Sequence, residues 1–471
     1  MALYRDPPQG IDWIHMKSDA LSLNPLNPDI LNLDGLTLKD LEIFESDSGG
    51  QTLFDFCNQS RSEGGARVLR QRMSAPWSNP DRIRKTQDSL HFIHEYRSVF
   101  NKLPSAYATA RVGHYLQDIL PIVTHHNSLE FAVNAFSLWA NHATHYRSIV
   151  RGVQITCRVI QGIREFMSQG ELPSAGGELV DIFQEIQKIL APPGLAKVPT
   201  QEQAGWAFKI LRLDQDFRIH EKETVSRLLA LIFEIDALVA MADVTQSNGY
   251  VMPQVEDGAM RVVAEDLVHP FLAQAVANPV NINQEQRVLF LTGPNMAGKT
   301  TYLRAFATSL YLAHLGMGVP ASRFSFVPAE QLFSSISLRD DLSTGTSYFR
   351  AEALRVKAIA LAISKGHRVV AIMDEPFKGT NVKDAFDASR AILERFSTKE
   401  ACLFMFSSHL IELSEHISNT GKIDCRYFEA EEGEGKLRFN YLLRPGVSSQ
   451  RLGMRVLHEE GVFELLDGHS G

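Results

Sequence analysis

The sequence predicts a multi-domain protein with an all-helical region followed by an α/β region. From about residue 37 to residue 260, apolar residues recur at helical spacing. The clearest stripe consists of Val225, Leu228, Leu229, Ile232, Ile235 and Leu238. After about residue 260, short apolar runs alternate with helix-patterned stretches, an order typical of a doubly wound sheet. The chain has 471 residues, of which 44% are hydrophobic, so it is long enough to bury more than one core.

Within the helical region, residues 37–125 are expected to form helices with arginine-rich turns. These arginines are Arg61, Arg67, Arg70, Arg72, Arg82 and Arg84. They fit solvated helix faces and a nucleic-acid or partner surface about equally well. Proline-free stretches at 127–170 and 205–245 predict long helices. The residues between them are expected to form a loop, because they include Pro173, Gly176, Gly177, Pro192, Pro193 and Pro199.

The most specific motif is a phosphate-binding loop at residues 293–300, Gly-Pro-Asn-Met-Ala-Gly-Lys-Thr. An apolar strand is expected before it at 287–292 and a helix after it at 301–315. Glycines let the backbone curl around phosphate oxygens, Lys299 can reach the β- and γ-phosphates, and Thr300 can ligate Mg²⁺. The predicted nucleotide-binding residues are Gly293, Pro294, Asn295, Met296, Ala297, Gly298, Lys299, Thr300 and Thr301. The motif therefore predicts binding of a nucleoside triphosphate with Mg²⁺.

Two further strands are expected to end in catalytic side chains. An apolar run at 368–373 leads into Asp374 and Glu375, and a second at 401–406 leads into Ser407, Ser408 and His409. After a buried strand, the aspartate can support Mg²⁺ and the glutamate can polarise the attacking water. A histidine beyond the end of a core strand lies on the ligand side of an α/β sheet, although a histidine in a loop is often structural. Together these motifs predict an ATPase.

These motifs resemble those of the MutS family of DNA mismatch-repair ATPases, whose nucleotide-binding domain is of the ABC type. The resemblance rests on the Pro-Asn-Met insert of the loop, Asp374-Glu375 with Gly379-Thr380, and Ser407-Ser408-His409. It also rests on a signature segment, residues 341–352, whose Ser347 is expected to act on the nucleotide of a partner subunit. The resemblance therefore implies a homodimer through the ATPase domains. It also implies Mg²⁺ on Thr300 and Asp374, and catalysis by Glu375, His409 and Ser347 in trans.

The same resemblance predicts the domain organisation. It implies an N-terminal arm at 1–36, a helical MutS-like core and lever at 37–260, and the ATPase domain at 261–471. No mismatch-reading domain is expected, because about 36 proline-rich residues precede the core and lack the family's Phe-x-Glu wedge. Phe183-Gln-Glu185 matches the Phe-x-Glu pattern, but it lies in a helix-patterned stretch and is interpreted as a coincidence. Ala275 stands where the family has an aromatic residue that stacks on adenine, which leaves base selectivity open.

Composition restricts the possible partners. The formal net charge of −8 argues against extensive non-specific binding of nucleic acid, although a local basic face is compatible with it. The four cysteines are scattered without metal-site spacing, and the N-terminus has no apolar signal segment. A cytoplasmic protein without membrane association is therefore expected.

The sequence thus predicts an ATP-hydrolysing conformational switch that binds DNA. It is expected to act in DNA repair or recombination on structured rather than singly mismatched DNA. The alternative is an ATP-gated module that assembles protein or ribonucleoprotein without touching DNA. A transporter ATPase is disfavoured by the amino-acid sequence of the signature segment and by the helical region that precedes the ATPase domain.

Overall fold

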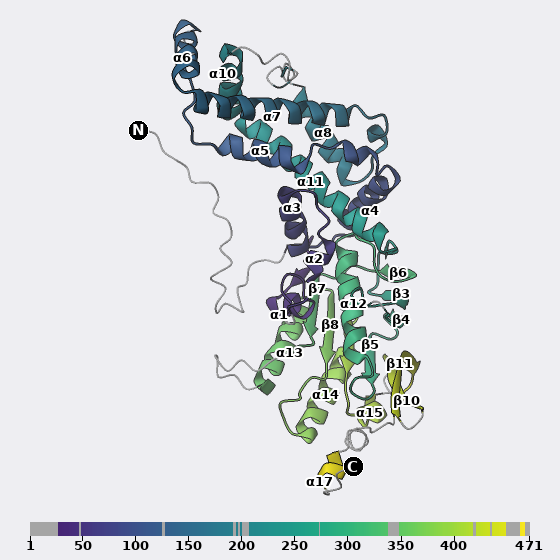
Figure 1. Ribbon diagram of the computed structural model, residues 1–471. Helices are drawn as coiled ribbons and strands as arrows, with labels where there is room; N and C mark the ends of the chain where they lie inside the picture. Colours follow the sequence, from purple (N-terminus) through teal and green to yellow (C-terminus); the bar gives the residue numbers. More distant parts are fainter. Residues whose placement is uncertain are drawn as a thin grey trace.

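The computed structural model describes most of the chain and shows an elongated molecule. The described residues are 27–46, 49–124, 128–191, 195, 198–199, 207–272, 274–337, 348–417, 421–433, 436–448 and 462–466. Figure 1 shows helices gathered at one end and the sheets at the other, with α11 (Lys222–Ser247) running between them. A helical region followed by an α/β region is therefore the architecture that the sequence predicts.

The helical end is built from helices with clear sequence signals at their N-termini. Its elements are α2 (Leu53–Cys57), α3 (Glu63–Ser74), α4 (Pro80–Glu95), α5 (Ala106–Gln117), α6 (Ser128–Asn141), α7 (Ala143–Met167), α8 (Glu178–Leu190), α10 (Ala207–Gln215), a π-helix (Asp216–His220) and α11. Ser62 caps α3 by accepting the Gly65 N–H, and Asn79 caps α4 ahead of Pro80. Such caps satisfy N–H groups that the first helical turn leaves unpaired.

Helix α11 organises this end, and the apolar stripe predicted on it is buried. It packs against α3, whose glycines allow a close approach. A Cβ atom on Gly65 would lie 2.1 Å from an Asp236 carboxylate oxygen, and one on Gly64 would lie 2.4 Å from the Phe233 ring. Asp236 in turn accepts the N–H groups of Arg61 and Ser62 at 3.1 and 2.9 Å. The start of α3 is therefore fixed on α11 by both packing and hydrogen bonds.

One expectation for the helical region is wrong. The segment between the long helices is not a continuous loop, since it contains α8, which is thirteen residues long. The long helices also have different main neighbours: α7 packs against α5 and α10, whereas α11 packs against α3 and α4. The physical reason is that α8 and α10 carry apolar faces of their own, which are buried between the long helices and the rest of the bundle.

Several of the arginines expected in turns lie instead within helices α3 and α4, where they contact other parts of the fold. Arg72 of α3 forms an ion pair with Glu178 of α8, and Arg84 of α4 pairs with Asp257. The guanidinium of Arg70 lies over the Phe44 ring, 4.3 Å from its centroid. For these arginines, the structure therefore shows contacts within the fold, although Arg70 is still exposed.

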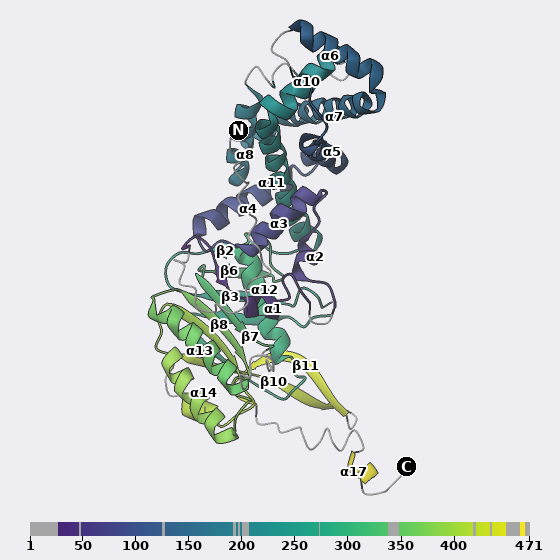
Figure 2. The ribbon, with the colours of Figure 1, turned by 90° about the vertical axis from the view of Figure 1, so that its left-hand side faces the viewer.

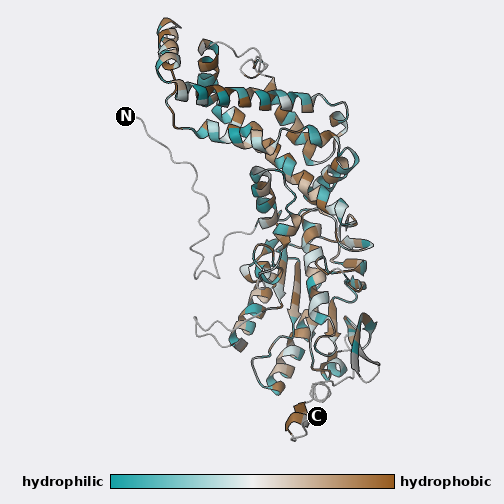
Figure 3. Ribbon diagram, in the orientation of Figure 1, coloured by the Kyte–Doolittle hydropathy of each residue, from teal (hydrophilic) through white to brown (hydrophobic). Residues whose placement is uncertain are grey.

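The sheet end is centred on a seven-stranded sheet, and its central strands are coloured as hydrophobic in Figure 3. The strand order is β1 (Asn32–Leu33), β7 (Gln331–Ser335), β8 (Val369–Asp374), β9 (Cys402–Ser407), β5 (Val288–Thr292), β10 (Ile423–Gly433) and β11 (Lys436–Pro445). All neighbouring pairs are parallel except β10 with β11. Buried parallel strands explain why these segments are continuous apolar runs.

Helices cover both faces of this sheet, as alternation along the strands requires. Leu289 and Leu291 belong to the core that contains α12 (Lys299–His314). Val288 and Phe290 belong to a second core with α13 (Tyr348–Ser364), α14 (Val382–Phe396) and α15 (Leu413–Ile417). Figure 2 shows α13 and α14 together on that face. A short helix, α17 (Val462–Leu466), lies near the C-terminus.

A smaller four-stranded sheet joins the helical end to the main sheet. Its order is β2 (Gln254–Val255), β6 (Arg323–Phe326), β3 (Val262–Leu267) and β4 (Asn278–Ile282). Residues 32–33, expected in the arm, and 254–255, expected in the helical region, thus pair with strands of the C-terminal half. The helix α1 (Gly35–Asp40) packs on β7 beside them. Across the described ranges, no helix has the length and apolar character needed to cross a membrane.

Candidate active site

The loop between β5 and α12 has a backbone that depends on glycine. Gly293 and Gly298 have φ values of 137° and 102°, in the region that side chains disfavour. A Cβ atom on Gly293 would lie 2.6 Å from the carbonyl oxygen of Phe428 in β10. Met296, at the tip, also has a positive φ of 70° and is 80% exposed. The two motif glycines are therefore required by the shape of the loop itself.

The loop and the start of α12 present unpaired backbone donors. The N–H groups of Gly298, Lys299 and Thr300 have no acceptor among the described residues. Pro294, Asn295 and Ala297 complete the loop, and Thr301 lies exposed in the first turn of the helix. Because a helix carries partial positive charge at its N-terminus, this arrangement fits an anionic group such as a phosphate.

Lys299 is buried at the base of this loop. Its Nζ donates to the carbonyl oxygens of Gly293 and Pro294 at 2.7 and 3.1 Å. It also lies 3.3 Å from Oε1 of Glu375, and its side chain is only 4% exposed. A buried ammonium group needs such partners, because an unpaired charge in a protein interior is costly. The positive charge of the motif therefore lies directly between the loop and the end of β8.

Asp374 at the end of β8 accepts hydrogen bonds from two hydroxyl groups. Thr300 Oγ1 donates to its Oδ2 at 2.6 Å, and the Ser407 hydroxyl of β9 donates to its other oxygen. A carboxylate beside a hydroxyl group supplies the hard oxygen ligands that Mg²⁺ prefers. The two predicted metal-site residues are therefore adjacent, and their chemistry fits the cation.

Glu375 follows directly in an unusual backbone conformation, with a φ of 47°. Its N–H donates to Ser407 Oγ at 3.0 Å, which fixes the turn at the strand end. Its carboxylate lies 2.8 Å from Lys378 Nζ and 3.9 Å from Nδ1 of His409. Burial alone would raise its pKa, but the hydrogen bond from Lys378 and the charge of Lys299 together lower it. Glu375 is therefore ionised at neutral pH.

His409 lies just beyond β9, as predicted, with a side chain that is 59% exposed. The structure thus brings together Lys299, Thr300, Asp374, Glu375 and His409 at the carboxyl ends of neighbouring strands. This is the edge at which open α/β sheets bind their ligands. The remaining predicted catalytic residue, Ser347, lies outside the described residues.

Tyr441 was not predicted from the sequence, yet its ring lies against the loop. A Cβ atom on Gly298 would be 3.2 Å from Tyr441 Cδ1. The ring is 45% exposed, and the residue has a strained φ of 57°. Asn278 holds this part of β11 by donating to the Tyr441 carbonyl oxygen and accepting the Leu443 N–H. Whereas Ala275 offers no ring, Tyr441 places an aromatic face beside the phosphate-binding loop.

Glu352 of α13 is a second residue whose place at the site the sequence did not reveal. It is buried, and its Oε1 accepts the N–H groups of Phe377 and Lys378 at 2.5 and 3.3 Å. Its Oε2 has no hydrogen-bond partner among the described residues. Burial raises its pKa, and the backbone hydrogen bonds oppose this effect. Glu352 therefore holds the turn that follows Glu375.

The fold and this geometry define an α/β domain with a candidate nucleotide-binding site, attached to a helical region. Comparison with known proteins identifies its family, because residues 289–465 match the family model MutS domain V. The resemblance predicted from the sequence is therefore confirmed for residues 289–465, which are similar to domain V of MutS proteins.

Two curated relatives are named "DNA mismatch repair protein MutS". The protein from Oceanobacillus iheyensis is 31% identical over 239 residues, which cover 49% of this chain and 27% of the relative. The protein from Chloroflexus aurantiacus is 31% identical over 245 residues, which cover 50% of this chain and 25% of the relative. The chain therefore corresponds to about a quarter of the length of these relatives.

Proposed function

We propose that this protein is a MutS-like ATPase that works as a nucleotide-driven conformational switch. The observation that carries the proposal is the convergence of Lys299, Asp374 and Glu375 on one loop with unpaired backbone donors. The proposed organisation is an arm at 1–36, a helical core and lever at 37–260 and a P-loop ATPase domain of the ABC type at 261–471. The family match over residues 289–465 supports the assignment.

In the proposed binding step, Lys299 exchanges partners. Its ammonium group now bonds two loop carbonyl oxygens and lies near Glu375. The β- and γ-phosphates of ATP would replace these partners, while the loop N–H groups and the N-terminus of α12 bind the remaining oxygens. Thr300 and Asp374 would hold Mg²⁺, which neutralises charge on the phosphates when bound. Binding thereby releases Glu375 from its ion pair with Lys299.

In the proposed hydrolytic step, Glu375 orients and polarises the attacking water. Its lowered pKa keeps the carboxylate ionised, so it can accept a hydrogen bond from water at neutral pH. His409, 3.9 Å away, is placed to respond to the γ-phosphate through the same carboxylate. Glu352 positions the turn that follows Glu375, and thereby the water-binding groups.

Contacts from α1 support a link between hydrolysis and assembly. Asp40 accepts the N–H groups of Ile336 and Ser337, just before the segment that carries Ser347. Arg355 of α13, just after that segment, donates to Thr37 and pairs with Asp34. One short helix therefore holds both flanks of the signature segment. We infer that Ser347 completes the site of a partner subunit in a cytoplasmic homodimer.

The proposed substrate is structured DNA, in repair or recombination. The family match and the two relatives named for DNA mismatch repair support this choice. An ATP-gated assembly module without DNA contact remains the second candidate, favoured by the net charge of −8. Salt-sensitive DNA binding that changes with nucleotide separates the two.

Two substitutions test the residue assignments, because one should remove ATP binding and the other should remove only hydrolysis. Lys299→Ala should abolish tight ATP binding, because it removes the group that meets the phosphates. Glu375→Gln should retain ATP binding but slow hydrolysis by about 10²–10⁴-fold, because only the water loses its partner. Binding of a fluorescent ATP analogue and release of phosphate measure the two steps separately.

Two further variants complete this test. His409→Ala should slow turnover with little change in affinity. Lys399→Ala, an exposed lysine after α14, serves as the control and should leave both steps unchanged. Turnover at the wild-type rate in Glu375→Gln would show that the catalytic role is wrongly assigned.

A further inference from the structure

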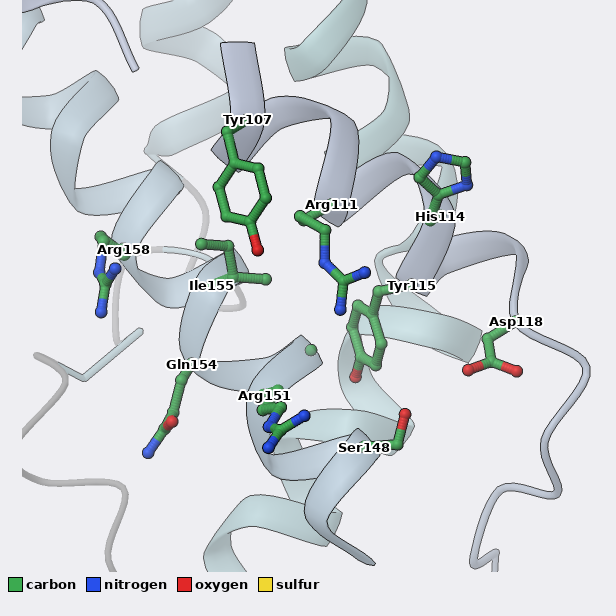
Figure 4. A pocket seen from close by; sticks show the side chains of 11 residues that line it. Tyr107, Arg111, His114, Tyr115, Asp118, Ser148, Arg151, Gln154, Ile155 and Arg158 are labelled. Atoms are coloured by element: carbon green, nitrogen blue, oxygen red, sulfur yellow. The ribbon is translucent and has the colours of Figure 1, made fainter. Parts of the chain in front are cut away.

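A cleft between α5 and α7 in the helical end lies far from the nucleotide site in the fold. It has a volume of about 390 Å³ and includes side chains from both helices. Figure 4 shows Tyr107, Arg111 and His114 of α5 around it, together with Arg151 and Arg158 of α7. Neither the sequence motifs nor the ATPase mechanism uses any of these residues.

The two helices that form the cleft are strongly basic in an acidic chain. Between them, α5 and α7 carry five arginines, at positions 111, 147, 151, 158 and 164, against one acidic residue, Glu165. On α7, Arg147, Arg151 and Arg158 share one face because they are spaced by four and seven residues. Asp118 is the acidic residue that lines the cleft, and one of its oxygens accepts the Leu120 N–H. The cleft therefore favours an anionic ligand.

Two of the arginines at the cleft, Arg111 and Arg151, are available for such a ligand. Arg111 and Arg151 are exposed, and within the described part of the chain neither is paired with a carboxylate. This differs from the arginines of α3 and α4, where Arg72 and Arg84 are paired with acidic residues. An exposed guanidinium without an acidic partner can bind phosphate oxygens at little cost.

The floor of the cleft is rigid. Tyr115 packs on Gly152, where a Cβ atom would lie 2.1 Å from its ring. The Tyr115 hydroxyl donates to the buried Asp214 at 2.6 Å, and Arg218 pairs with the same carboxylate at 2.9 Å. Because α5 and α7 are fixed in this way, the basic side chains stand on a preformed surface rather than on a loop.

An exposed aromatic residue indicates which polyanion the cleft fits. Tyr107, in line with Arg111 on α5, is 72% exposed, and His114 lies on the same face. Proteins that bind single-stranded nucleic acid combine a basic groove for the backbone with aromatic side chains on which bases stack. A duplex keeps its bases stacked inside, and an acidic peptide has no bases, so neither would use Tyr107 in this way.

We propose that the cleft between α5 and α7 binds a single-stranded segment of nucleic acid. Arg111 and Arg151 hold the backbone phosphates, and Tyr107 stacks on an unpaired base. This inference rests on the proposed DNA-binding function and specifies its surface and the kind of strand that it takes. Structured DNA such as a fork or flap contains single-stranded segments of this kind.

Equilibrium binding of the full chain to a fluorescent 20-nucleotide single strand tests the proposal. The double variant Arg111→Gln/Arg151→Gln should bind at least tenfold more weakly at one fixed salt concentration. Its slope of log K against log salt should become shallower by about 1.4, because each lost phosphate contact on a single strand accounts for about 0.7. Tyr107→Ala should weaken binding about fivefold without changing this slope, because it removes stacking and not charge.

Three controls make the result decisive. Arg395→Gln, at an exposed arginine of α14 whose guanidinium bonds the Ala391 carbonyl oxygen and no carboxylate within the described ranges, should leave binding unchanged. All variants should keep wild-type ATP turnover and thermal unfolding, which shows that they are folded.

Wild-type affinity of the double variant would overturn the cleft assignment and leave DNA binding intact. No binding of any DNA by the wild type would overturn the DNA-binding function as well. Equal affinity for an oligoglutamate of matched charge would show an acidic-protein surface instead.

Discussion

Lys299 and Glu375 are the residue pair on which the proposed switch depends. Lys299 Nζ lies 3.3 Å from the Glu375 carboxylate, so the buried ammonium and the largely buried carboxylate neutralise each other. A phosphate that binds Lys299 must displace this interaction, which leaves Glu375 with Lys378 and the nearby His409. In the proposed mechanism, nucleotide binding is thus coupled at the atomic level to the release of the carboxylate that is expected to polarise water.

Tyr441 is predicted to stack on the base of the nucleotide. Tyr441→Ala should weaken ATP binding roughly tenfold, since stacking of a base on an aromatic ring contributes about 1–3 kcal/mol. Tyr441→Phe should bind normally because it keeps the ring. Titration with inorganic triphosphate, which has no base, supplies the control and should show no difference between the variants. Equal loss of affinity for ATP and triphosphate would mean that Tyr441 only shapes the loop.

At the scale of elements, α8 is held in place by a carboxylate that reaches two other helices. Glu178, at the start of α8, pairs with Arg72 of α3 and accepts a hydrogen bond from Thr86 of α4. Burial alone would raise its pKa, but Arg72 and Thr86 together lower it. A group with a lowered pKa contributes stability above its ordinary pKa, and this contribution is lost as pH falls through the folded-state value.

Glu178→Gln should therefore reduce the free energy of unfolding by about 2–4 kcal/mol at pH 7, because it leaves the largely buried Arg72 without its charged partner. The difference from wild type should shrink as pH falls below the ordinary glutamate pKa and through the lowered folded-state pKa of Glu178, because the wild-type carboxylate then becomes protonated. Urea unfolding of the wild type and the variant at several pH values measures this difference in the free energy of unfolding. Glu185→Gln is the matched control on the same helix, because its exposed pair with Arg227 should contribute less than about 0.5 kcal/mol. An equal effect of the two substitutions would refute the role of Glu178.

The strands and helices around the nucleotide site could be predicted because their signals are local. The strand expected at 287–292 is β5, the strand at 368–373 is β8, and the helix at 301–315 is α12, each within two residues of its expected start. Continuous apolar runs, glycine at fixed positions and acidic residues at strand ends are all contained in short windows. The proposed metal-site residues Thr300 and Asp374 and the proposed catalytic residues Glu375 and His409 follow from the same windows.

Other features depend on contacts that no short window contains. Tyr441 reaches Gly298 through the β10–β11 hairpin, and Asp40 reaches Ile336 through the docking of α1 on β7. For α8 a local signal does exist, since Leu179, Ile182, Phe183 and Ile186 form a buried stripe. The surrounding prolines and glycines suggested a loop, but they mark the ends of α8 and not its interior. The prolines and glycines on either side of α8 thus led to the prediction of a loop for the whole segment.

At the scale of the molecule, this protein is predicted not to distinguish a single mismatch from perfect duplex. Reading a mismatch requires a side chain inserted at the defect and a bend in the DNA. The one Phe-x-Glu sequence among the described residues lies in α8, where Phe183 is 5% exposed and Glu185 pairs with Arg227. Binding to a G·T duplex and to matched duplex should therefore agree within a few-fold at one salt concentration. A preference of tenfold or more would contradict this prediction.

The central claim is that ATP drives a switch between states of assembly, and molecular mass in solution tests it most directly. Light scattering should give a mass near the 52.7 kDa of one chain without nucleotide. Glu375→Gln with Mg²⁺ and ATP should give twice this mass, because it retains ATP and holds the two ATPase faces together. Lys299→Ala should stay at the mass of one chain under the same conditions. If both variants gave the same mass with and without ATP, nucleotide would not control assembly and the account would be wrong.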